Sequence, residues 1–206
     1  MRVVIAGGHG QIALLLERLL VDRGDQAVGI VRNPDHAAEL TAIGAQAVVL
    51  DLERADLDAV AEVLAGADAA VFAAGAGPGS GVARKDTVDR AAAMLFADAA
   101  QAAGVRRHLQ ISAMGLDRAG DPAVDEVFRA YLAAKDAAER DLRRRDLDWT
   151  ILRPGRLTDG PATGRVVLAD SAPPGAVSRA DVAAVLLDLL DDPSTAGRTL
   201  ELVSAG

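Results

Sequence analysis

Three side chains in the second half of the chain have types and a spacing that suit acid–base chemistry. Tyr131 is the only tyrosine, and Lys135, one of two lysines, follows it by four residues. On a helix this spacing puts both side chains on one face, and an ammonium beside a phenol lowers the pKa of the phenol toward neutrality. Such a phenol can exchange a proton with a substrate oxygen, which the hydroxyl of Ser112 can orient. Ser112, Tyr131 and Lys135 are therefore candidate catalytic residues. The alternative is an amphipathic helix with a half-buried tyrosine and a solvated lysine.

A glycine turn near the start of the chain has the form of a dinucleotide-binding fingerprint. An apolar strand over 2–6 runs into Gly7-Gly8-His9-Gly10-Gln11-Ile12-Ala13, and 14–20 continues as a helix. Glycines let the backbone turn tightly and approach a pyrophosphate, whose charge then lies at the positive end of the helix. The strand before and the helix after favour this interpretation over a plain strand-to-helix turn. His9 is able to touch a phosphate from this loop, although a solvent-facing turn histidine is the commoner case.

The end of the second apolar run bears on which dinucleotide binds. Proteins that prefer NAD usually place an acidic residue about 20 residues beyond the glycines, where it binds the ribose 2′-hydroxyl. Here the run ends in Ile30-Val31-Arg32-Asn33, and the first acidic residue after it is Asp35. The planar donor fork of Arg32 suits a 2′-phosphate, so the sequence favours NADP over NAD. The alternative is that Arg32 is an ordinary exposed arginine.

Strands that alternate with helices must position these groups. Apolar strands are predicted over 2–6, 27–31, 47–50, 69–73, 108–111 and 149–152, with helices over 14–20, 34–43, 56–64, 86–103 and 124–145. This order predicts an α/β fold, a three-layer doubly wound parallel sheet (Rossmann fold). We expect one domain over 1–206, with 156–206 as a small substrate-side extension. Ligands bind such sheets at the carboxyl ends of the strands. The residues there are Gly7 to Gly10, Arg32, Asp51-Leu52, Ala73 to Gly77, Ser112 and Pro154-Gly155.

Composition excludes several classes of function. The net charge of -8 argues against binding to nucleic acid and leaves no basic patch for a membrane. Cysteine is absent, and three histidines without metal-ligand spacing predict no metal site. Neither a cleavable leader nor an apolar run of about 18 residues is evident, so we expect a cytoplasmic protein. Charges spread over 136–146 make that helix a poor interface, which predicts a monomer or weak homodimer.

The chain resembles the atypical or extended short-chain dehydrogenases/reductases, the NAD(P)-binding, epimerase-like branch. The matching elements are Gly7-x-x-Gly10-x-x-Ala13, Asp51-Leu52, Ala73-Ala74-Gly75, Ser112, Tyr131-x-x-x-Lys135, 149–155 and 179–183. The resemblance implies that Asp51 and Leu52 border the adenine and that Ser112, Tyr131 and Lys135 are catalytic. The expected cofactor contacts are Gly7, Gly8, His9, Gly10, Gln11, Ile12, Arg32, Asp51, Leu52, Ala73, Ala74, Gly75, Lys135 and Pro154. The chain departs from the family in carrying Ala13 for the third glycine, and Gly8-His9 where small or hydroxyl residues are commoner.

Three functions fit these residues. The first is an NADP-dependent oxidoreductase of a small carbonyl or alcohol, with Tyr131 as the proton donor. The second is an NAD(P)-dependent epimerase or dehydratase that uses the same residues. The third is an NADP-binding redox sensor without turnover. The intact pair of Tyr131 and Lys135 argues against a pure sensor, and the short segment after residue 155 argues against a large nucleotide-sugar pocket.

Overall fold

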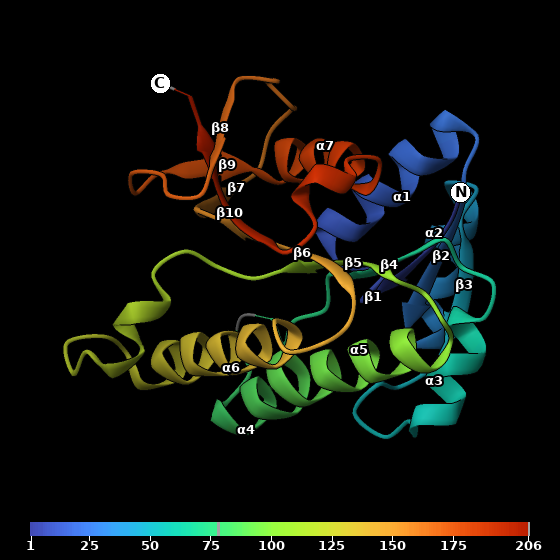
Figure 1. The fold of residues 1–206 in the computed structure, drawn as a ribbon, viewed down its shortest axis with the longest axis horizontal. Helices are drawn as coiled ribbons and strands as arrows, with labels where there is room; N and C mark the ends of the chain where they lie inside the picture. The colour runs from blue at the N-terminus through green and yellow to red at the C-terminus, as the bar shows by residue number, and fades with distance from the viewer. Residues whose placement is uncertain (78, 206) are drawn as a thin grey trace.

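The computed structural model describes residues 1–77 and 79–205 and has a central eight-stranded sheet between two layers of helices (Figure 1). Seven strands run parallel, and the edge strand β8 pairs antiparallel with β10. The sheet order is β3 (Gln46–Val49), β2 (Gln26–Val31), β1 (Arg2–Ala6), β4 (Ala69–Phe72), β5 (Arg107–Ile111), β6 (Asp148–Pro154), β10 (Arg198–Ser204) and β8 (Val166–Ala169). The first six strands of the chain are adjacent in the order 3-2-1-4-5-6, which confirms the predicted Rossmann-type α/β fold.

Helices cover the two faces of the sheet in separate groups. One face carries α1 (Gln11–Arg23), α2 (Ala37–Ala42) and α7 (Arg179–Leu190), and the other carries α3 (Leu57–Leu64), α5 (Ala93–Ala102) and α6 (Glu126–Leu142). Short 3₁₀ turns η1 (Pro34–His36), η3 (Leu116–Gly120) and η4 (Pro193–Thr195) join these elements. Among the described residues, no helix combines the length and apolar character needed to cross a membrane.

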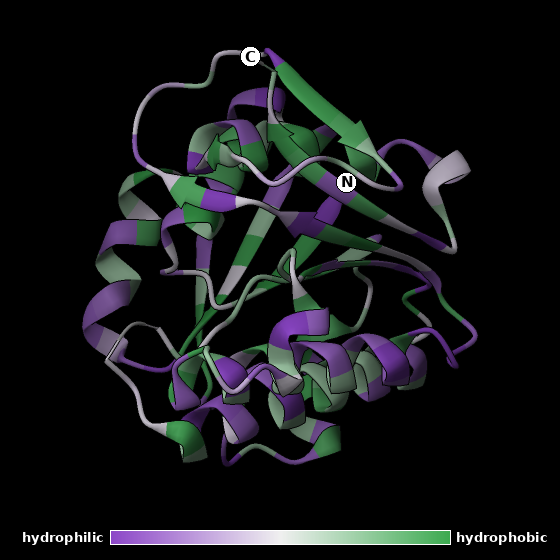
Figure 2. Cartoon of the chain, turned by 90° about the vertical axis from the view of Figure 1, so that its left-hand side faces the viewer, coloured by the Kyte–Doolittle hydropathy of each residue, from purple (hydrophilic) through white to green (hydrophobic). Residues whose placement is uncertain are grey.

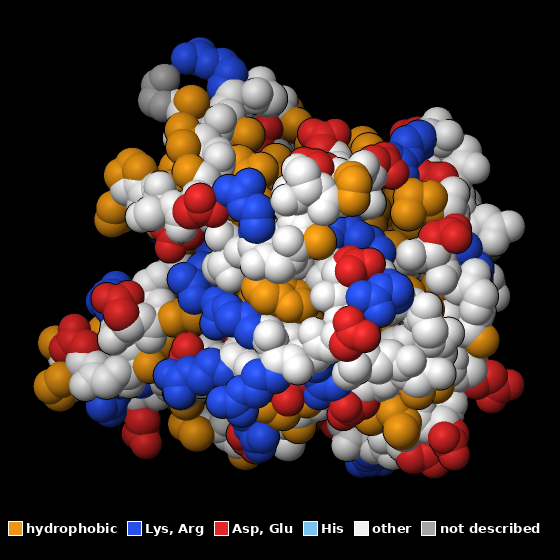
Figure 3. Space-filling view, in the orientation of Figure 1, with side chains coloured by type: hydrophobic (Ala, Val, Ile, Leu, Met, Phe, Trp, Pro, Cys, Tyr) orange, Lys and Arg blue, Asp and Glu red, His pale blue; other side chains and the backbone are white. Residues whose placement is uncertain are grey.

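The sheet is buried on both sides, which explains its near-continuous apolar strands. Successive side chains of a strand point to opposite faces. In β1, Val3 and Ile5 accordingly pack toward α1 and α7, whereas Val4 and Ala6 pack toward α3 and α5. Figure 2 shows the hydrophobic strands at the centre and hydrophilic stretches on the helices around them. Over α6, Figure 3 shows a band of basic side chains with acidic ones among them, as the sequence predicts for a solvated helix surface.

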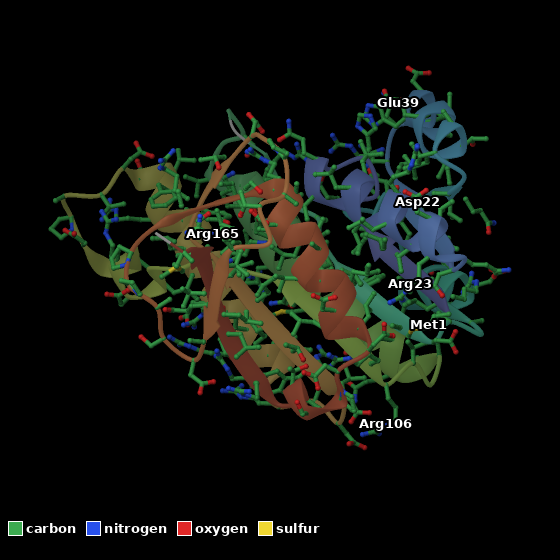
Figure 4. The ribbon with its side chains drawn as sticks, turned by 90° about the horizontal axis from the view of Figure 1, so that it is seen from above. Met1, Asp22, Arg23, Glu39, Arg106 and Arg165 are labelled. Carbon is green, nitrogen blue, oxygen red and sulfur yellow. The ribbon has the colours of Figure 1, made fainter. Side chains whose placement is uncertain are left out.

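The segment after β6 does more than extend the substrate side. It adds β10 and β8 to the main sheet and packs α7 against α1, while β7 (Arg156–Thr158) and β9 (Ala176–Ser178) form a separate two-stranded sheet. Arg23, at the end of α1, donates to Asp25 and to Asp191, which follows α7 (Figure 4). No strand is predicted here from the sequence, because β7, β8 and β9 are short and partly exposed and β10 lies beyond the regular alternation of strands and helices.

The helix predicted over 86–103 is divided in the structure. It begins with α4 (Val82–Arg84), continues as the π-helical η2 (Lys85–Ala92), and ends as α5. π-Helical turns bond residue i to i+5 and occur mostly at functional sites. In η2 the buried residues include two charged ones, Lys85 and Asp89. The periodicity of an ordinary helix gives no sign of this local change in winding.

Candidate active site

Two adjoining cavities lie along the carboxyl edge of the sheet. The first, of about 250 Å³, lies at the ends of β1, β2, β3 and β4, and the second, of about 530 Å³, lies between β4, β5, β6, η2 and α6. Both are lined by Gly10, Ala73, Ala74 and Gly75. The two cavities therefore form one groove that passes over the glycine turn. All the predicted catalytic residues and cofactor contacts line this groove, with the exception of Gly8.

The glycine turn brings backbone rather than side chains to the groove. Gly7 has a φ of 80°, and a Cβ there would lie 2.6 Å from the Cα of Ala74. The N–H of Gly10 donates to the oxygen of Gly7 over 2.8 Å. Gly10 then starts α1 without a side-chain cap, so Gln11 and Ile12 bring the positive end of the helix to the groove. This cradle suits a pyrophosphate.

Gly8 has a different role from the one predicted. Its N–H donates to the oxygen of Ile30 over 2.9 Å, and a Cβ on it would lie 2.6 Å from the Cα of Gly29. Gly8 lies beneath the groove and lines neither cavity, because the loop is pressed against β2 at this point. The same Cβ would lie 2.8 Å from Oε1 of Glu17, whose carboxyl fills the space that the glycines leave.

Glu17 is a buried carboxyl below the glycine turn. Its side chain is fully buried, and neither oxygen has a hydrogen-bond partner among the described residues. Burial raises the pKa of Glu17 to about 8. The carboxyl is therefore largely protonated at neutral pH.

At the end of the first cavity, Arg32 is held by an acidic residue from the loop that follows β3. Its Nη1 lies 2.9 Å from Oε2 of Glu53, which also accepts from Arg84 over 2.8 Å and from Thr87 over 2.6 Å. Hydrogen bonding to Arg84 is the main cause that lowers the pKa of Glu53. No acidic residue directly follows β2, but Glu53, from the segment after β3, lies beside Arg32 in the folded protein. Asp51 and Leu52 line the same cavity, as predicted.

Two histidines stand in the wall of the first cavity. The rings of His9 and His36 stack with centroids 3.6 Å apart, and Nε2 of His9 lies 3.1 Å from Oε2 of Glu39. Glu39 projects from α2 at the outer side of this end of the molecule (Figure 4). His9 is partly buried here and takes part in a stacked pair, rather than standing as an isolated histidine in solvent.

The second cavity brings Tyr131 and Lys135 together on one face of α6, as their spacing predicts. Nζ of Lys135 lies 5.8 Å from the centroid of the Tyr131 ring. It donates to the oxygen of Ile111 over 3.2 Å and lies 3.3 Å from Oδ1 of Asp89. Lys135 is only 4% exposed, so the alternative of a solvated lysine is wrong. Asp125 caps this helix by accepting from the N–H of Phe128 over 3.0 Å.

The electrostatics of Tyr131 differ from the sequence-based expectation. Burial, together with the carboxylate of Asp89, raises the pKa of Tyr131 to about 12. Burial also lowers the pKa of Lys135, although Asp89 opposes this shift. The expected lowering of the phenol pKa is therefore wrong, because burial of the phenol and the nearby carboxylate of Asp89 both raise it. A raised pKa keeps the proton on the Tyr131 phenol at neutral pH.

Ser112 presents a free hydroxyl to the same cavity. Its N–H donates to the oxygen of Leu152 over 2.8 Å, which continues the β5–β6 pairing. Oγ is buried and has no partner among the described residues. Pro154, Leu157 and Phe128 line the same cavity. A buried hydroxyl of this kind is suited to a ligand oxygen.

Sequence reasoning missed the charged residues that the π-helical segment and the loop after β3 bring to the groove. Asp89 pairs with Lys135, Lys85 lines the second cavity, and Glu53 pairs with Arg32. One available signal was that the chain has only two lysines, and both of them reach this site. Glu53 gave no such signal, since it is one acidic residue among many.

Comparison with known proteins agrees with this geometry. The model of the NAD(P)H-binding family matches residues 7–193. The chain belongs to this family. A Bacillus subtilis protein described as an uncharacterized sugar epimerase is 34% identical over 203 residues, which are 98% of this chain and 94% of that protein.

Solved structures with a similar fold also include NAD(P)-related proteins. One from Bacillus halodurans, described as an NAD-dependent epimerase/dehydratase, is 34% identical, with a TM-score of 0.91 over 100% of this chain and 94% of its own. An anaerobilin reductase from Escherichia coli O157:H7 is 26% identical, with a TM-score of 0.82 over 99% of this chain and 97% of its own. The proteins similar to this chain thus include both epimerase-like proteins and a reductase.

Proposed function

We propose that the protein is an NADP-dependent reductase of a small carbonyl compound. The observation that carries this proposal is that Tyr131 lines the same cavity as the unpartnered hydroxyl of Ser112. Burial in this cavity raises the pKa of the phenol. Both groups line the second cavity, which adjoins the first, so a carbonyl oxygen bound between them would lie beside the dinucleotide groove. A phenol that keeps its proton suits the reductive direction, in which the substrate oxygen gains one.

The chain's own residues would act in a simple order. Ser112 Oγ and the Tyr131 hydroxyl donate hydrogen bonds to the carbonyl oxygen and polarise the C=O bond. When bound, NADPH supplies the hydride that the carbonyl carbon accepts. As negative charge grows on the oxygen, Tyr131 transfers its proton to it, so that an alcohol forms. The ammonium of Lys135, held by Asp89 and by the Ile111 carbonyl, stabilises the resulting phenolate.

The preference for NADP rests on Arg32. Its guanidinium is about half exposed at the first cavity and is the group best suited to a 2′-phosphate. Binding would require Arg32 to exchange its contact with Glu53 for the phosphate. Arg84 would then retain Glu53, because the two already share a hydrogen bond of 2.8 Å.

An epimerase or dehydratase is the second candidate, favoured by the descriptions of the relatives from the two Bacillus species. Against it stands the size of the second cavity, about 530 Å³, which must also take the nicotinamide end of the cofactor. That space leaves little room for a nucleotide-sugar. A reductase consumes NADPH with each turnover, whereas an epimerase or dehydratase recycles its cofactor.

The decisive experiment screens small ketones and aldehydes for NADPH consumption. Product formed with NADPH that carries deuterium at both C4 positions should contain one deuterium per NADPH oxidised. Tyr131→Phe removes only the hydroxyl, so it should bind NADPH as the wild type does and lose about 10²-fold or more in turnover, the usual worth of positioned acid–base catalysis. Turnover of an identified substrate by Tyr131→Phe at the wild-type rate would rule out the assignment. Conversion without net NADPH oxidation would favour the second candidate.

A further inference from the structure

We propose that the second cavity contains a carboxylate subsite centred on Lys85, so that the carbonyl substrate also carries a carboxylate. The identity of the substrate as a carbonyl rests on the proposed function. The subsite itself rests on a separate set of contacts, which do not involve the reacting atoms.

Lys85 lies deep in the cavity, not on the surface. It begins η2, is 7% exposed, and lines the cavity together with Tyr131. Its Nζ lies 5.5 Å from the centroid of the Tyr131 ring. It donates to the backbone oxygen of Gly77 over 2.9 Å. Because an ammonium has three protons, this bond leaves donors for a ligand.

The other charged groups around the cavity are already matched. Lys135 has Asp89 at 3.3 Å, and Arg179 has Asp159 at 2.7 Å. Asp125 caps the N-terminus of α6.

Lys85 differs from these groups. Within the described part of the chain, no carboxylate lies within 4.0 Å of its Nζ. A buried charge is costly unless it is paired and hydrogen-bonded, so a carboxylate from the substrate would complete this site.

The surroundings of Lys85 favour a small carboxylate over a phosphate of the cofactor. The pyrophosphate cradle is formed by Gly7, Gly10 and the start of α1, whereas Lys85 is grouped with Tyr131. The rings of Phe128 and Tyr131 stack with centroids 5.7 Å apart, and together with Leu157 they give the cavity an apolar lining. The single unmatched ammonium of Lys85 beside apolar side chains suits a ligand with one carboxylate attached to an apolar group.

The test compares keto acids with their methyl esters, using phenylglyoxylate, 3-benzoylpropionate and 4-oxopentanoate and the three matching esters. The wild type should reduce at least one acid with a kcat/KM about 10 to 100 times that of its ester, the range that a charge-assisted hydrogen bond supplies. Lys85→Gln keeps a donor for the Gly77 oxygen but loses the charge, so its kcat/KM for the acid should fall to about that for the ester. Lys85→Arg should keep most of the ratio of acid to ester. A structural role through the Gly77 bond predicts instead that both variants keep the ratio.

A binding measurement separates this proposal from the proposed function. Mandelate and mandelamide have no ketone to reduce, and their binding is measured by saturation-transfer NMR on the NADPH-loaded protein, which cannot oxidise their hydroxyl groups. Mandelate should bind the wild type and Lys85→Arg but not Lys85→Gln, whose NADPH affinity and Tm should match those of the wild type. If no carbonyl is reduced but mandelate binds in this pattern, the reductase proposal fails and the subsite stands. Reduction of esters as efficient as that of acids, or equal binding of mandelate and mandelamide, overturns the subsite.

Discussion

Replacing Glu17 by glutamine should stabilise the protein more at pH 8 than at pH 5. The carboxyl has a pKa of about 8 in the folded protein, against an ordinary value of 4.5. As the pH rises above 4.5, the unfolded chain releases this proton while the folded protein retains it. Unfolding is therefore increasingly favoured up to about pH 8, where the folded form also loses the proton, and the effect levels off above that pH.

The two pKa values set the size of the effect. Through the linkage relation they give a cost to folding of about 1 kcal/mol at pH 5 and about 4 kcal/mol at pH 8. Glutamine has the shape of the protonated carboxyl but does not titrate, so Glu17→Gln removes the pH-dependent part. The quantity compared is the free energy of unfolding of the variant minus that of the wild type. This difference should be about 3 kcal/mol larger at pH 8 than at pH 5. For a chain of this length that corresponds to a relative gain in Tm of about 6–12 °C.

Urea unfolding followed by the fluorescence of the single tryptophan, Trp149, measures this difference at pH 5, 6, 7 and 8. Glu62→Gln, at an exposed position on α3, is the matched control, and its effect on the unfolding free energy should stay within about 0.5 kcal/mol at every pH. All other titrating groups are common to the variant and the wild type, so they cancel. A difference between Glu17→Gln and wild type that is constant from pH 5 to pH 8 would refute the reasoning.

Three further outcomes are expected. Gly10→Val should abolish NADPH binding but leave a folded protein by circular dichroism, because a Cβ at Gly10 would already lie 3.1 Å from the Gly7 oxygen at the mouth of the cradle. Arg32→Ala should reduce the affinity for NADPH and leave that for NADH unchanged in calorimetric titrations; equal losses for both would remove Arg32 from the 2′-phosphate site. Glu53→Gln should raise the ratio of NADPH to NADH affinity, since it frees Arg32 and removes a negative charge beside it, and a fall in this ratio would contradict that reasoning.

The sequence predicts the part of the fold that depends on local pattern. The first six strands of the chain lie within a few residues of their predicted positions, because strands buried on both faces are continuously apolar. The later strands escaped prediction because β7, β8 and β9 are short and partly exposed, and β10 lies beyond the alternating series. The π-helical winding of η2 escaped for a similar reason, since side-chain periodicity over eight residues does not distinguish it from an α-helix.

For the site, the sequence locates residues that sit at strand ends or at a helical spacing. It places Tyr131 and Lys135 on one face, but it reveals neither the burial of the phenol nor the third member of that cluster, Asp89. Burial and Asp89 together reverse the expected shift in the pKa of the phenol. Such a shift depends on burial and on partners that are distant in the chain. Gly8 shows the same limit, because only the packed loop reveals that it faces β2 rather than the groove.

The concentration of lysine in the cavity has a practical consequence for labelling the protein. Lys85 and Lys135 are the only lysines of the chain, and both are more than nine-tenths buried. The outer surface obtains its positive charge from arginine, which amine-directed reagents do not modify. Acylating reagents, formaldehyde crosslinks and amine-coupled sensor chips would therefore react at the amino terminus or within the cavity. A small aldehyde trapped with cyanoborohydride becomes a reporter of cavity occupancy, read by the mass of two peptides.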